Sequence, residues 1–409
     1  HCLLIQPSGT IRLERYWKPK ISRRLNDEAS ADEAENTRRL FLEAINRQLV
    51  SDVPVGTCLS GGIDSSSVVS AIRKVHPKGS TSTGEWIKTF SAIFPGYPID
   101  ESEYAKRVCE VARAEYNPVQ PTADDLWRDL PDLVRCQEEP FTSTSIYAQY
   151  RVMKRARERG VTVLLDGQGG DELLCGYITL YLHYLLMLRK LGSYHRLLVE
   201  GVRSRDLTGP LVRPQVLAYF KRLLTYGRSL VSRANPAMSK TRTEATVSAD
   251  DLPGVLESLT SVHGLPALLR YEDKNSMWHS IEARVPFLDR PFFEHVAALP
   301  LDRKLRDGWT KHIFRRAMSG VLPEEIRLRR SKIGFETPEK KWIDKELRGH
   351  LQEFFSGSDL RASRFYNAEA LRKLLAEPRL TVDETSRIWR TLNLELWFQE
   401  FFGEMRGAQ

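Results

Sequence analysis

The sequence predicts an α/β protein with a doubly wound, mostly parallel sheet and a large helical C-terminal portion. Short apolar runs rich in Val and Leu alternate with segments whose apolar residues recur at helical spacing, a pattern typical of β–α–β units. Two of these runs end in glycine-rich turns, and ligands of such sheets bind beyond the carboxyl ends of the strands. After Leu173 the pattern is mostly helical to the end of the chain.

The predicted elements follow one another in chain order through the first half of the sequence. A strand is expected within residues 1–20, where "SGTIRLERYWKP" alternates apolar and polar residues after a Ser-Gly turn. Further strands are expected at 53–60, 86–94 and 161–166. Helices are expected at 26–50, 64–75, 100–115, 122–136 and 146–160.

The chain has no apolar run long enough for a membrane span, and its cysteines do not indicate a disulfide framework. The longest apolar stretch, Leu180–Leu191, contains His183 and Arg189 and falls short of the roughly 20 residues that a span needs. The five cysteines are odd in number, widely spaced and without a C-x-x-C pair, which argues against disulfides and structural zinc. A reducing cytoplasm is therefore the expected location.

Positive charge is concentrated in one part of the sequence. Residues 189–242 contain twelve Lys and Arg against two acidic residues, a larger excess than the net charge of +8 of the whole chain. One interpretation is a helical insertion with a solvated face, and the other is a docking surface for an acidic partner. No nucleic-acid recognition motif accompanies the charge.

The first glycine turn, in "LSGGIDSSSVV" (59–69), has the features of a phosphate site. Gly61 and Gly62 lack a Cβ, so the backbone can pass close to a ligand, and successive N–H groups can form an anion-binding nest. A helix that starts near Asp64 adds its N-terminal N–H groups. Asp64 would repel phosphate unless a divalent cation lay between them, which predicts Mg²⁺. The alternative is a serine-capped helix after an ordinary turn.

The second glycine turn, in "VTVLLDGQGGDELLCGY" (161–177), favours the ligand site over the alternative. It also follows an apolar strand, and it is followed by Asp171 and Glu172. Two such turns in one sheet can face each other, so that Asp64 and Asp171 share Mg²⁺ and hold a pyrophosphate.

Four motifs in order resemble one protein family. "SGGIDS" (60–65) resembles the pyrophosphate loop of the PP-loop ATP pyrophosphatases. Together with "DGQGGDELLCGY", "LLRYEDKNSMWHSIEARVPFLD" (268–289) and "RRSKIGFETPEKKWI" (329–343), it resembles the synthetase domain of glutamine-dependent asparagine synthetases over residues 20 to 400. Relatives of that family include β-lactam synthetases and lasso peptide cyclases.

The resemblance implies an ATP-dependent, AMP-forming carbon–nitrogen ligase. A substrate carboxylate would attack the α-phosphorus of ATP, pyrophosphate would leave, and ammonia would displace AMP from the acyl-adenylate. The alternatives are the same adenylation with a peptide or small-molecule amine as nucleophile, and a catalytically silent nucleotide-binding subunit.

The resemblance also assigns roles to individual residues. It implies that Lys332 is a catalytic lysine and that Asp64 and Asp171 bind magnesium, and Glu172 is a candidate proton acceptor. Residues expected to bind the nucleotide are Cys58, Leu59, Ser60, Gly61, Gly62, Asp64, Ser65 and Gly167.

The sequence also predicts roles for the motif "EARVPFLD" and for two histidines. Glu282 and Arg284 are expected to form a buried ion pair that supports the site, although contact with substrate is an alternative. His279 and His295 have no accompanying ligand cluster, so ordinary helix histidines are favoured over metal ligands.

The sequence departs from the asparagine synthetase pattern in two respects. Gln168 stands where the family has a glutamate implicated in handling ammonia, and an amide cannot accept a proton at neutral pH. A glutaminase half is also missing, although residues 1–20 resemble its end.

The expected organisation has four parts. Residues 1–20 are the tail of an absent N-terminal glutaminase-like domain, and 21–180 are the ATP-binding core. A basic helical insertion spans 181–260, and 261–409 complete the active site. The expected partners are the carboxylate substrate, ammonia or an amine, the absent domain and a second copy of the chain, without nucleic acid or membrane.

Overall fold

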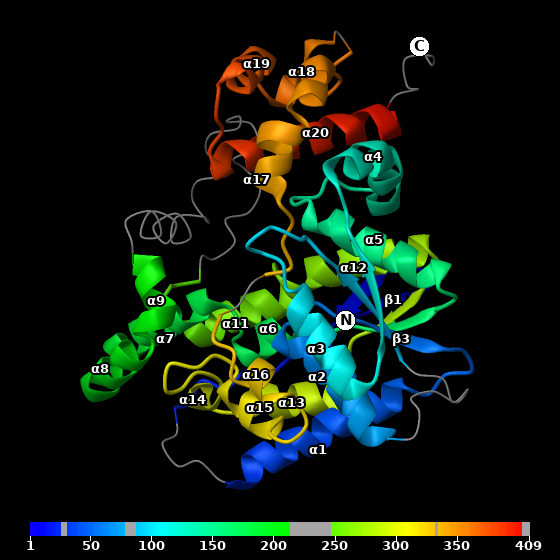
Figure 1. Ribbon diagram of the computed structural model, residues 1–409. Coiled ribbons are helices and arrows are strands. Elements are labelled where there is room, and N and C mark those ends of the chain that lie inside the picture. The colour runs from blue at the N-terminus through cyan, green and yellow to red at the C-terminus, as the bar shows by residue number, and fades with distance from the viewer. Residues whose placement is uncertain (26–30, 78–86, 213–246, 332–333, 358, 403–409) are drawn as a thin grey trace.

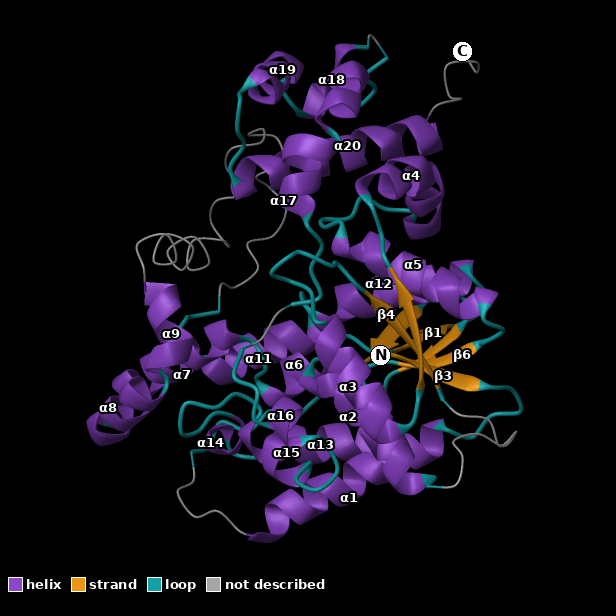
Figure 2. Cartoon of the chain, in the orientation of Figure 1, coloured by secondary structure: helices purple, strands orange, loops and turns teal. Residues whose placement is uncertain are grey.

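The computed structural model describes the chain except for residues 26–30, 78–86, 213–246, 332–333, 358 and 403–409. Helices make up most of the molecule, and the strands gather in one place (Figure 2). Within the described residues, no helix has both the length and the apolar character to cross a bilayer.

The core is a five-stranded sheet in which every pair of neighbouring strands is parallel. The strand order is β5-β4-β3-β6-β7. From β3 the chain therefore moves outward through β4 to β5 and then returns to the other side of β3 with β6. The point between β3 and β6 is the topological switch point, where ligands of doubly wound sheets bind. The strands are β3 (Val55–Cys58), β4 (Lys88–Ala92), β5 (Glu115–Val119), β6 (Val163–Leu165) and β7 (Glu282–Arg284).

Helices cover both faces of the sheet and continue beyond it (Figure 1). Those of the first half are α1 (Ala31–Gln48), α2 (Ile63–Val75), α3 (Ser102–Ala112), α4 (Ala123–Gln137), α5 (Ser145–Glu158), α6 (Gly170–Leu174), α7 (Ile178–Lys190), α8 (Tyr194–Arg203) and α9 (Arg205–Val212). Those of the second half are α11 (Leu252–Ser261), α12 (Leu265–Trp278), η2 (Pro286–Leu288), α13 (Arg290–Ala298), α14 (Leu301–Lys304), α15 (His312–Ala317), α16 (Glu324–Arg327), α17 (Glu339–Lys341), η3 (Trp342–Glu346), α18 (Arg348–Ser356), η4 (Ser363–Phe365), α19 (Ala368–Ala376) and α20 (Val382–Phe402).

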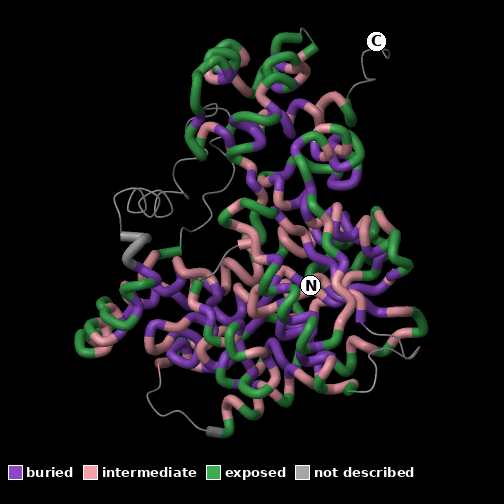
Figure 3. The backbone as a smooth tube through the Cα atoms, viewed as in Figure 1, coloured by how far each residue is buried: buried purple, intermediate pink, exposed green. Residues whose placement is uncertain are grey.

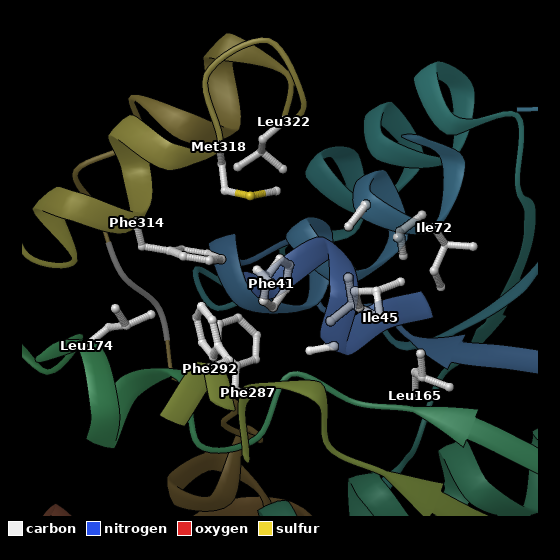
Figure 4. Close-up of a cluster of buried hydrophobic side chains, with 14 of the residues drawn as sticks. Phe41, Ile45, Ile72, Leu165, Leu174, Phe287, Phe292, Phe314, Met318 and Leu322 are labelled. Atoms are coloured by element: carbon white, nitrogen blue, oxygen red, sulfur yellow. The ribbon is translucent and has the colours of Figure 1, made fainter. Parts of the chain in front are cut away.

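The two faces of the sheet pack against different helices because strand side chains alternate. On β6, Val163 and Leu165 join the cluster that includes α1, α2 and α13, whereas Leu164 joins residues of α5 on the other face. Phe41 of α1 lies at the centre of the first cluster and contacts the rings of Phe287 and Phe314 (Figure 4). This packing fixes α2, and with it the turn that precedes α2, against the end of β3.

Two strands differ from the sequence prediction. The expected helix over 100–115 ends at Ala112, and β5 follows at the edge of the sheet, where Pro118 is tolerated. After Leu173 the described chain is mostly helical, as expected, but it also contains β7, which pairs with β6 along the opposite edge. A three-residue strand has too few positions for its alternation to show in the sequence.

The N-terminal residues form a separate two-stranded hairpin. The expected strand is β2 (Ile11–Glu14), and it pairs antiparallel with β1 (Cys2–Ile5). Every residue of both strands is exposed, including Leu3 and Leu13. An isolated hairpin is marginally stable in water, so this one contributes little to the core.

Candidate active site

The turn between β3 and α2 is held closed by its own hydroxyl groups. The Ser60 amide donates to Ser65 Oγ at 3.1 Å, and the Ser60 and Ser65 hydroxyls lie 3.0 Å apart. The Gly62 amide donates to Ser60 Oγ at 3.2 Å. Among the described residues, no side chain caps the N-terminus of α2. Its first N–H groups therefore remain available for an anion, which the positive end of a helix favours.

Gly61 is required by both conformation and space. Its φ is +87°, a region that favours glycine, and a Cβ at this position would lie 2.9 Å from the Glu101 carbonyl oxygen. The turn therefore packs directly against the start of α3. Leu59, which precedes it, is buried, and its amide donates to the Phe90 carbonyl of β4 at 2.9 Å.

The second glycine turn, between β6 and α6, touches the first one. A Cβ on Gly167 would lie 2.8 Å from the Ser65 amide nitrogen, and one on Gly170 would lie 2.6 Å from Asp64 Cγ. These two glycines therefore allow the turns to approach each other at the switch point. The structure brings the residues of both predicted motifs into one place.

Asp64 and Asp171 converge on a common cation, the ammonium group of Lys311. Lys311 Nζ forms an ion pair with Asp64 and lies 2.6 Å from Asp171 Oδ1. The Lys311 side chain is 4% exposed and the carboxylates 17% and 20%. Burial alone would lower the pKa of Lys311, but the attraction of Asp171 and Asp64 outweighs it, and the pKa is raised.

The sequence analysis did not identify Lys311. It precedes α15, with φ of +53°, about 250 positions after Asp64 in the sequence. A lysine in the turn "DGWTKHIF" carries no local signal of chemistry, and only tertiary packing places it between the two carboxylates. Close to it, the buried Arg315 has a pKa lowered to about 10, because desolvation outweighs the attraction of Asp64.

Glu172 lies behind the second turn. Its side chain is buried, and the Tyr177 hydroxyl donates a hydrogen bond to it. Burial raises the pKa of Glu172, the Tyr177 hydrogen bond opposes this, and the charge of Asp171 adds to the rise. A carboxyl group engaged in this way supports the turn, and its role as a proton acceptor stays a prediction.

Cys58 ends β3 and faces Asp166, the first residue after β6. Burial, together with the charge of Asp166, raises the pKa of the Cys58 thiol, which therefore stays protonated. The Asp166 carboxylate also accepts a hydrogen bond from the Gly167 amide. These contacts shape the turn that contains Gln168.

Lys332 lies outside the described residues, but side-chain contacts anchor the chain on both sides of it. On one side, Arg329 pairs with Glu101 at 2.5 Å and stacks over the Tyr104 ring at 4.0 Å. On the other side, Glu339 accepts a hydrogen bond from the Thr144 amide at 3.0 Å. Glu101 and Tyr104 belong to the segment that Gly61 touches.

The expected buried pair of Glu282 and Arg284 is only half correct. The ion pair exists at 2.6 Å, but the Glu282 side chain is 60% exposed. Arg284 also donates to the carbonyl oxygens of Gln48 and Val50. The pair lies on β7 at the sheet edge, where an exposed carboxylate keeps its hydration, and Arg284 fastens the end of α1.

His279 and His295 do not come together. The His279 ring packs against Tyr150 at 4.5 Å, and burial lowers the pKa of His279 to about 4. His295 lies on α13 and forms a 3.0 Å hydrogen bond with the Thr37 hydroxyl.

A parallel sheet with two facing glycine turns and paired carboxylates at its switch point is the arrangement of the nucleotide-binding doubly wound α/β class. A family model described as "Asparagine synthase" matches residues 36–399. The chain therefore belongs to the asparagine synthase family.

Individual relatives agree with this assignment. The chain is 29% identical to "Asparagine synthetase [glutamine-hydrolyzing] 1" of Bacillus subtilis, over 96% of this chain and 63% of that protein. It is 26% identical to a "Putative asparagine synthetase [glutamine-hydrolyzing]" of Mycobacterium tuberculosis, over 95% and 61%. It is 23% identical to "Amidase chyE" of Penicillium rubens, over 96% and 66%. The chain thus spans less than two thirds of the length of these relatives.

Proposed function

We propose that this chain adenylates a substrate carboxylate with ATP and passes the acyl group to ammonia, forming an amide. The observation that carries the proposal is the convergence of Asp64 and Asp171, from two glycine turns, on one cation beside the uncapped start of α2. This arrangement offers N–H donors and positive charge to a pyrophosphate and carboxylate ligands to a metal.

The residues of the two turns would bind and orient the triphosphate. The N–H groups that begin α2 and the hydroxyls of Ser60 and Ser65 would donate to phosphate oxygens, and Lys311 would neutralise their charge. Asp64 and Asp171 have the donor chemistry that Mg²⁺ prefers, and they already reach a common point. When bound there, Mg²⁺ would stabilise negative charge on the leaving pyrophosphate.

The proposed reaction has two balanced steps. A carboxylate oxygen forms a bond to the α-phosphorus of ATP, the bond to the bridging oxygen breaks, and pyrophosphate leaves. Ammonia then attacks the acyl carbon, gives up a proton, and AMP leaves with the electrons of the acyl–oxygen bond. Lys332 is proposed to stabilise charge in both steps, and the ion pair of Arg329 with Glu101, whose carbonyl group lies against Gly61, supports a position near the first turn.

The proposed ammonia source is a glutaminase-like domain. The names of the Bacillus and Mycobacterium relatives describe glutamine-hydrolyzing enzymes, and those proteins are longer than this chain.

A second candidate is the same adenylation with an amine of a peptide or small molecule as nucleophile. Gln168 favours it, because an amide side chain cannot accept the proton of an incoming ammonium ion. One of the relatives is also named as an amidase and not as an asparagine synthetase.

Pyrophosphate exchange into ATP separates these candidates. The chain is incubated with ATP, Mg²⁺, labelled pyrophosphate and a panel of acids that includes aspartate. Exchange with aspartate, and asparagine with AMP after ammonia is added, would support the first candidate. Exchange only with a peptide or another acid would support the second, and no exchange with any acid would contradict both.

Asp64→Asn tests the assignment of the site. We expect exchange to fall at least 100-fold, because the variant loses both a metal ligand and the charge partner of Lys311. Asp359→Asn is the matched control, since that carboxylate is 70% exposed in a pair with Arg361. Near-normal exchange in Asp64→Asn would contradict the assignment.

A further inference from the structure

A tight hairpin turn leads the chain to Lys311. Arg306 and Trp309 pair across this turn by two backbone hydrogen bonds, of 2.8 and 3.1 Å. The central residues, Asp307 and Gly308, have positive φ angles of +54° and +72°, as two-residue turns of type I′ require. Because Lys311 follows Trp309 by two positions, the place of its side chain depends on how the turn is held.

A buried glutamate of helix α8 anchors the 306–309 turn. Glu200 is the only buried residue of α8, a helix that is described throughout. Its carboxylate accepts hydrogen bonds from the Asp307 and Gly308 amides, at 3.1 and 3.3 Å, and from the Tyr181 hydroxyl. Helices α7, α8 and α9 extend from the body of the molecule, and α8 is largely exposed (Figures 1 and 3). The one buried position of this exposed helix therefore holds the turn.

Two arginines lie over the indole ring of Trp309. The guanidinium carbon of Arg315 is 5.0 Å from the ring centroid, and that of Arg330 is 4.5 Å from it. Both distances are within the roughly 6 Å over which an aromatic face attracts a cation, and tryptophan attracts cations most strongly. Arg315 belongs to α15, and Arg330 belongs to the motif 329–343 that contains Lys332. The ring thus joins two segments that are separate in the sequence.

Arg315 also fixes the backbone next to Lys311. Its Nε donates to the Thr310 carbonyl at 2.8 Å, and its Nη1 donates to the Arg327 carbonyl at 2.6 Å. Thr310 directly precedes Lys311, and Arg327 ends α16, which leads into the motif. Arg315 is buried, so these bonds are shielded from water. One guanidinium group therefore contacts the ring, the approach to Lys311 and the approach to the motif.

We propose that Trp309 is a positioning residue, which holds Lys311 and the segment leading to Lys332 in a fixed relation by stacking with Arg315 and Arg330. This inference rests on the proposed adenylation, in which both lysines stabilise negative charge. Lys311 lies just outside α15 and not within a helix or strand, so its position depends on such contacts. Small displacements of groups that stabilise a transition state lower the rate steeply.

Trp309→Leu removes the ring and keeps an apolar side chain. We expect the maximal rate of pyrophosphate exchange to fall about tenfold and the KM for ATP to change by less than about threefold, because the lysines act mainly on the transition state. Trp309→Phe retains an aromatic face and should keep at least about half of the wild-type rate. Phe365→Leu is the matched control, because it removes a ring beneath Arg364, in η4.

Two kinetic outcomes would overturn the inference. Equal losses in Trp309→Leu and Trp309→Phe would mean that the size of the side chain matters and the stacking does not. A lower unfolding temperature of Trp309→Leu with an unchanged exchange rate would identify a ring that only stabilises the fold.

Arg330→Gln tests whether the ring acts through its arginine. The double variant Trp309→Leu/Arg330→Gln should lose little more activity than the weaker of the two single variants, because both substitutions remove the same stack. Asp206→Asn is the control, since it removes only the ion pair of Arg330 with an exposed carboxylate and should leave the rate unchanged. Independent, multiplying losses in the double variant, or a loss in Asp206→Asn equal to that in Arg330→Gln, would contradict the inference.

Hydrogen exchange separates this inference from the proposed function, because it needs no substrate. In Trp309→Leu the amides of residues 311–317 and 327–331 should exchange faster than in wild type, whereas those of α18 should not change. Wild-type protein that gives no pyrophosphate exchange with any acid would contradict the adenylation itself. Unchanged hydrogen exchange of both segments in Trp309→Leu would contradict only the positioning role.

Discussion

At the scale of single residues, the site depends on a lysine that neutralises two carboxylates. Lys311 is almost fully buried, and its charge persists because Asp64 and Asp171 surround it. Removing one partner of a buried ion pair leaves uncompensated charge, which destabilises a protein more than the pair stabilised it.

Lys311→Met should lower the free energy of unfolding at pH 7.5 by on the order of 3 kcal/mol. The two remaining carboxylates repel each other, which raises their pKa values in the folded state. The difference in free energy of unfolding between wild type and variant should therefore shrink toward pH 5. If the carboxylates bind Mg²⁺, the ion should restore the stability of the variant. Thermal unfolding at both pH values, with and without MgCl₂, measures this.

Lys373→Met is the control for that variant, because it removes only an exposed pair with Glu369. If Mg²⁺ does not change the unfolding temperature of Lys311→Met, the proposal that Asp64 and Asp171 bind the metal is contradicted.

Glu272 is a second buried ionisable group, and neither of its carboxyl oxygens has a hydrogen-bond partner among the described residues. Burial, with the charges of Asp166 and Asp273, raises its pKa well above the ordinary value. A carboxyl group of this kind stabilises the fold below its unfolded-state pKa, about 4.3, and loses that contribution as pH rises through the folded-state pKa.

Glu272→Gln should therefore be more stable than wild type at pH 8, on the order of 1 kcal/mol, and should lose that advantage near pH 4. Denaturant unfolding across this range gives the comparison. Glu353 is exposed on α18, so Glu353→Gln should leave the free energy of unfolding unchanged at both pH values. A Glu272→Gln variant that is less stable than wild type at pH 8 and closer to wild type near pH 4 would show that the carboxyl group is engaged as an anion.

At the scale of elements, the segment that contains the lysine motif is fastened to the first glycine turn. Arg329 joins Glu101 and Tyr104, and the Glu101 carbonyl and Tyr104 Cβ lie against Gly61. One arginine thereby connects the end of α16 with the start of α3.

Arg329→Gln should increase local opening of this segment more than it lowers the stability of the whole fold. Hydrogen exchange of peptides covering 329–340 should accelerate, and pyrophosphate exchange should fall about tenfold, since misplaced catalytic groups lose rate steeply. Lys106→Gln, which removes an exposed pair with Glu103 within α3, is the control. Unchanged hydrogen exchange in Arg329→Gln would mean that other contacts hold the segment.

At the scale of the whole molecule, the boundary expected near residue 20 can be tested by truncation. The hairpin β1–β2 is exposed, whereas Ile21 and Leu25 pack into the core and the Ser22 amide donates to the Ala297 carbonyl. Removal of residues 1–16 should leave the unfolding temperature within about 2 °C. Removal of residues 1–25 should lower it by more, because it exposes apolar surface. Equal effects of the two deletions would place the boundary elsewhere.

The sequence indicated the parallel sheet, its two glycine turns and the carboxylates Asp64 and Asp171, because these features depend on neighbouring residues. Alternation, helical spacing and a Gly-Gly pair are local, and a parallel sheet brings the ends of its strands together without further information. The family resemblance rested on four motifs in order, and the match over residues 36–399 confirms the family.

Only the tertiary structure decided what stands between those carboxylates and which surfaces remain open. Lys311 reaches Asp64 from about 250 positions away, and β7 completes the sheet from a three-residue segment. The exposure of an apolar side chain such as Leu198 on α8 is likewise visible only in the folded chain. Such contacts depend on how helices stack, and packing joins residues whose separation in the sequence leaves no periodic signal.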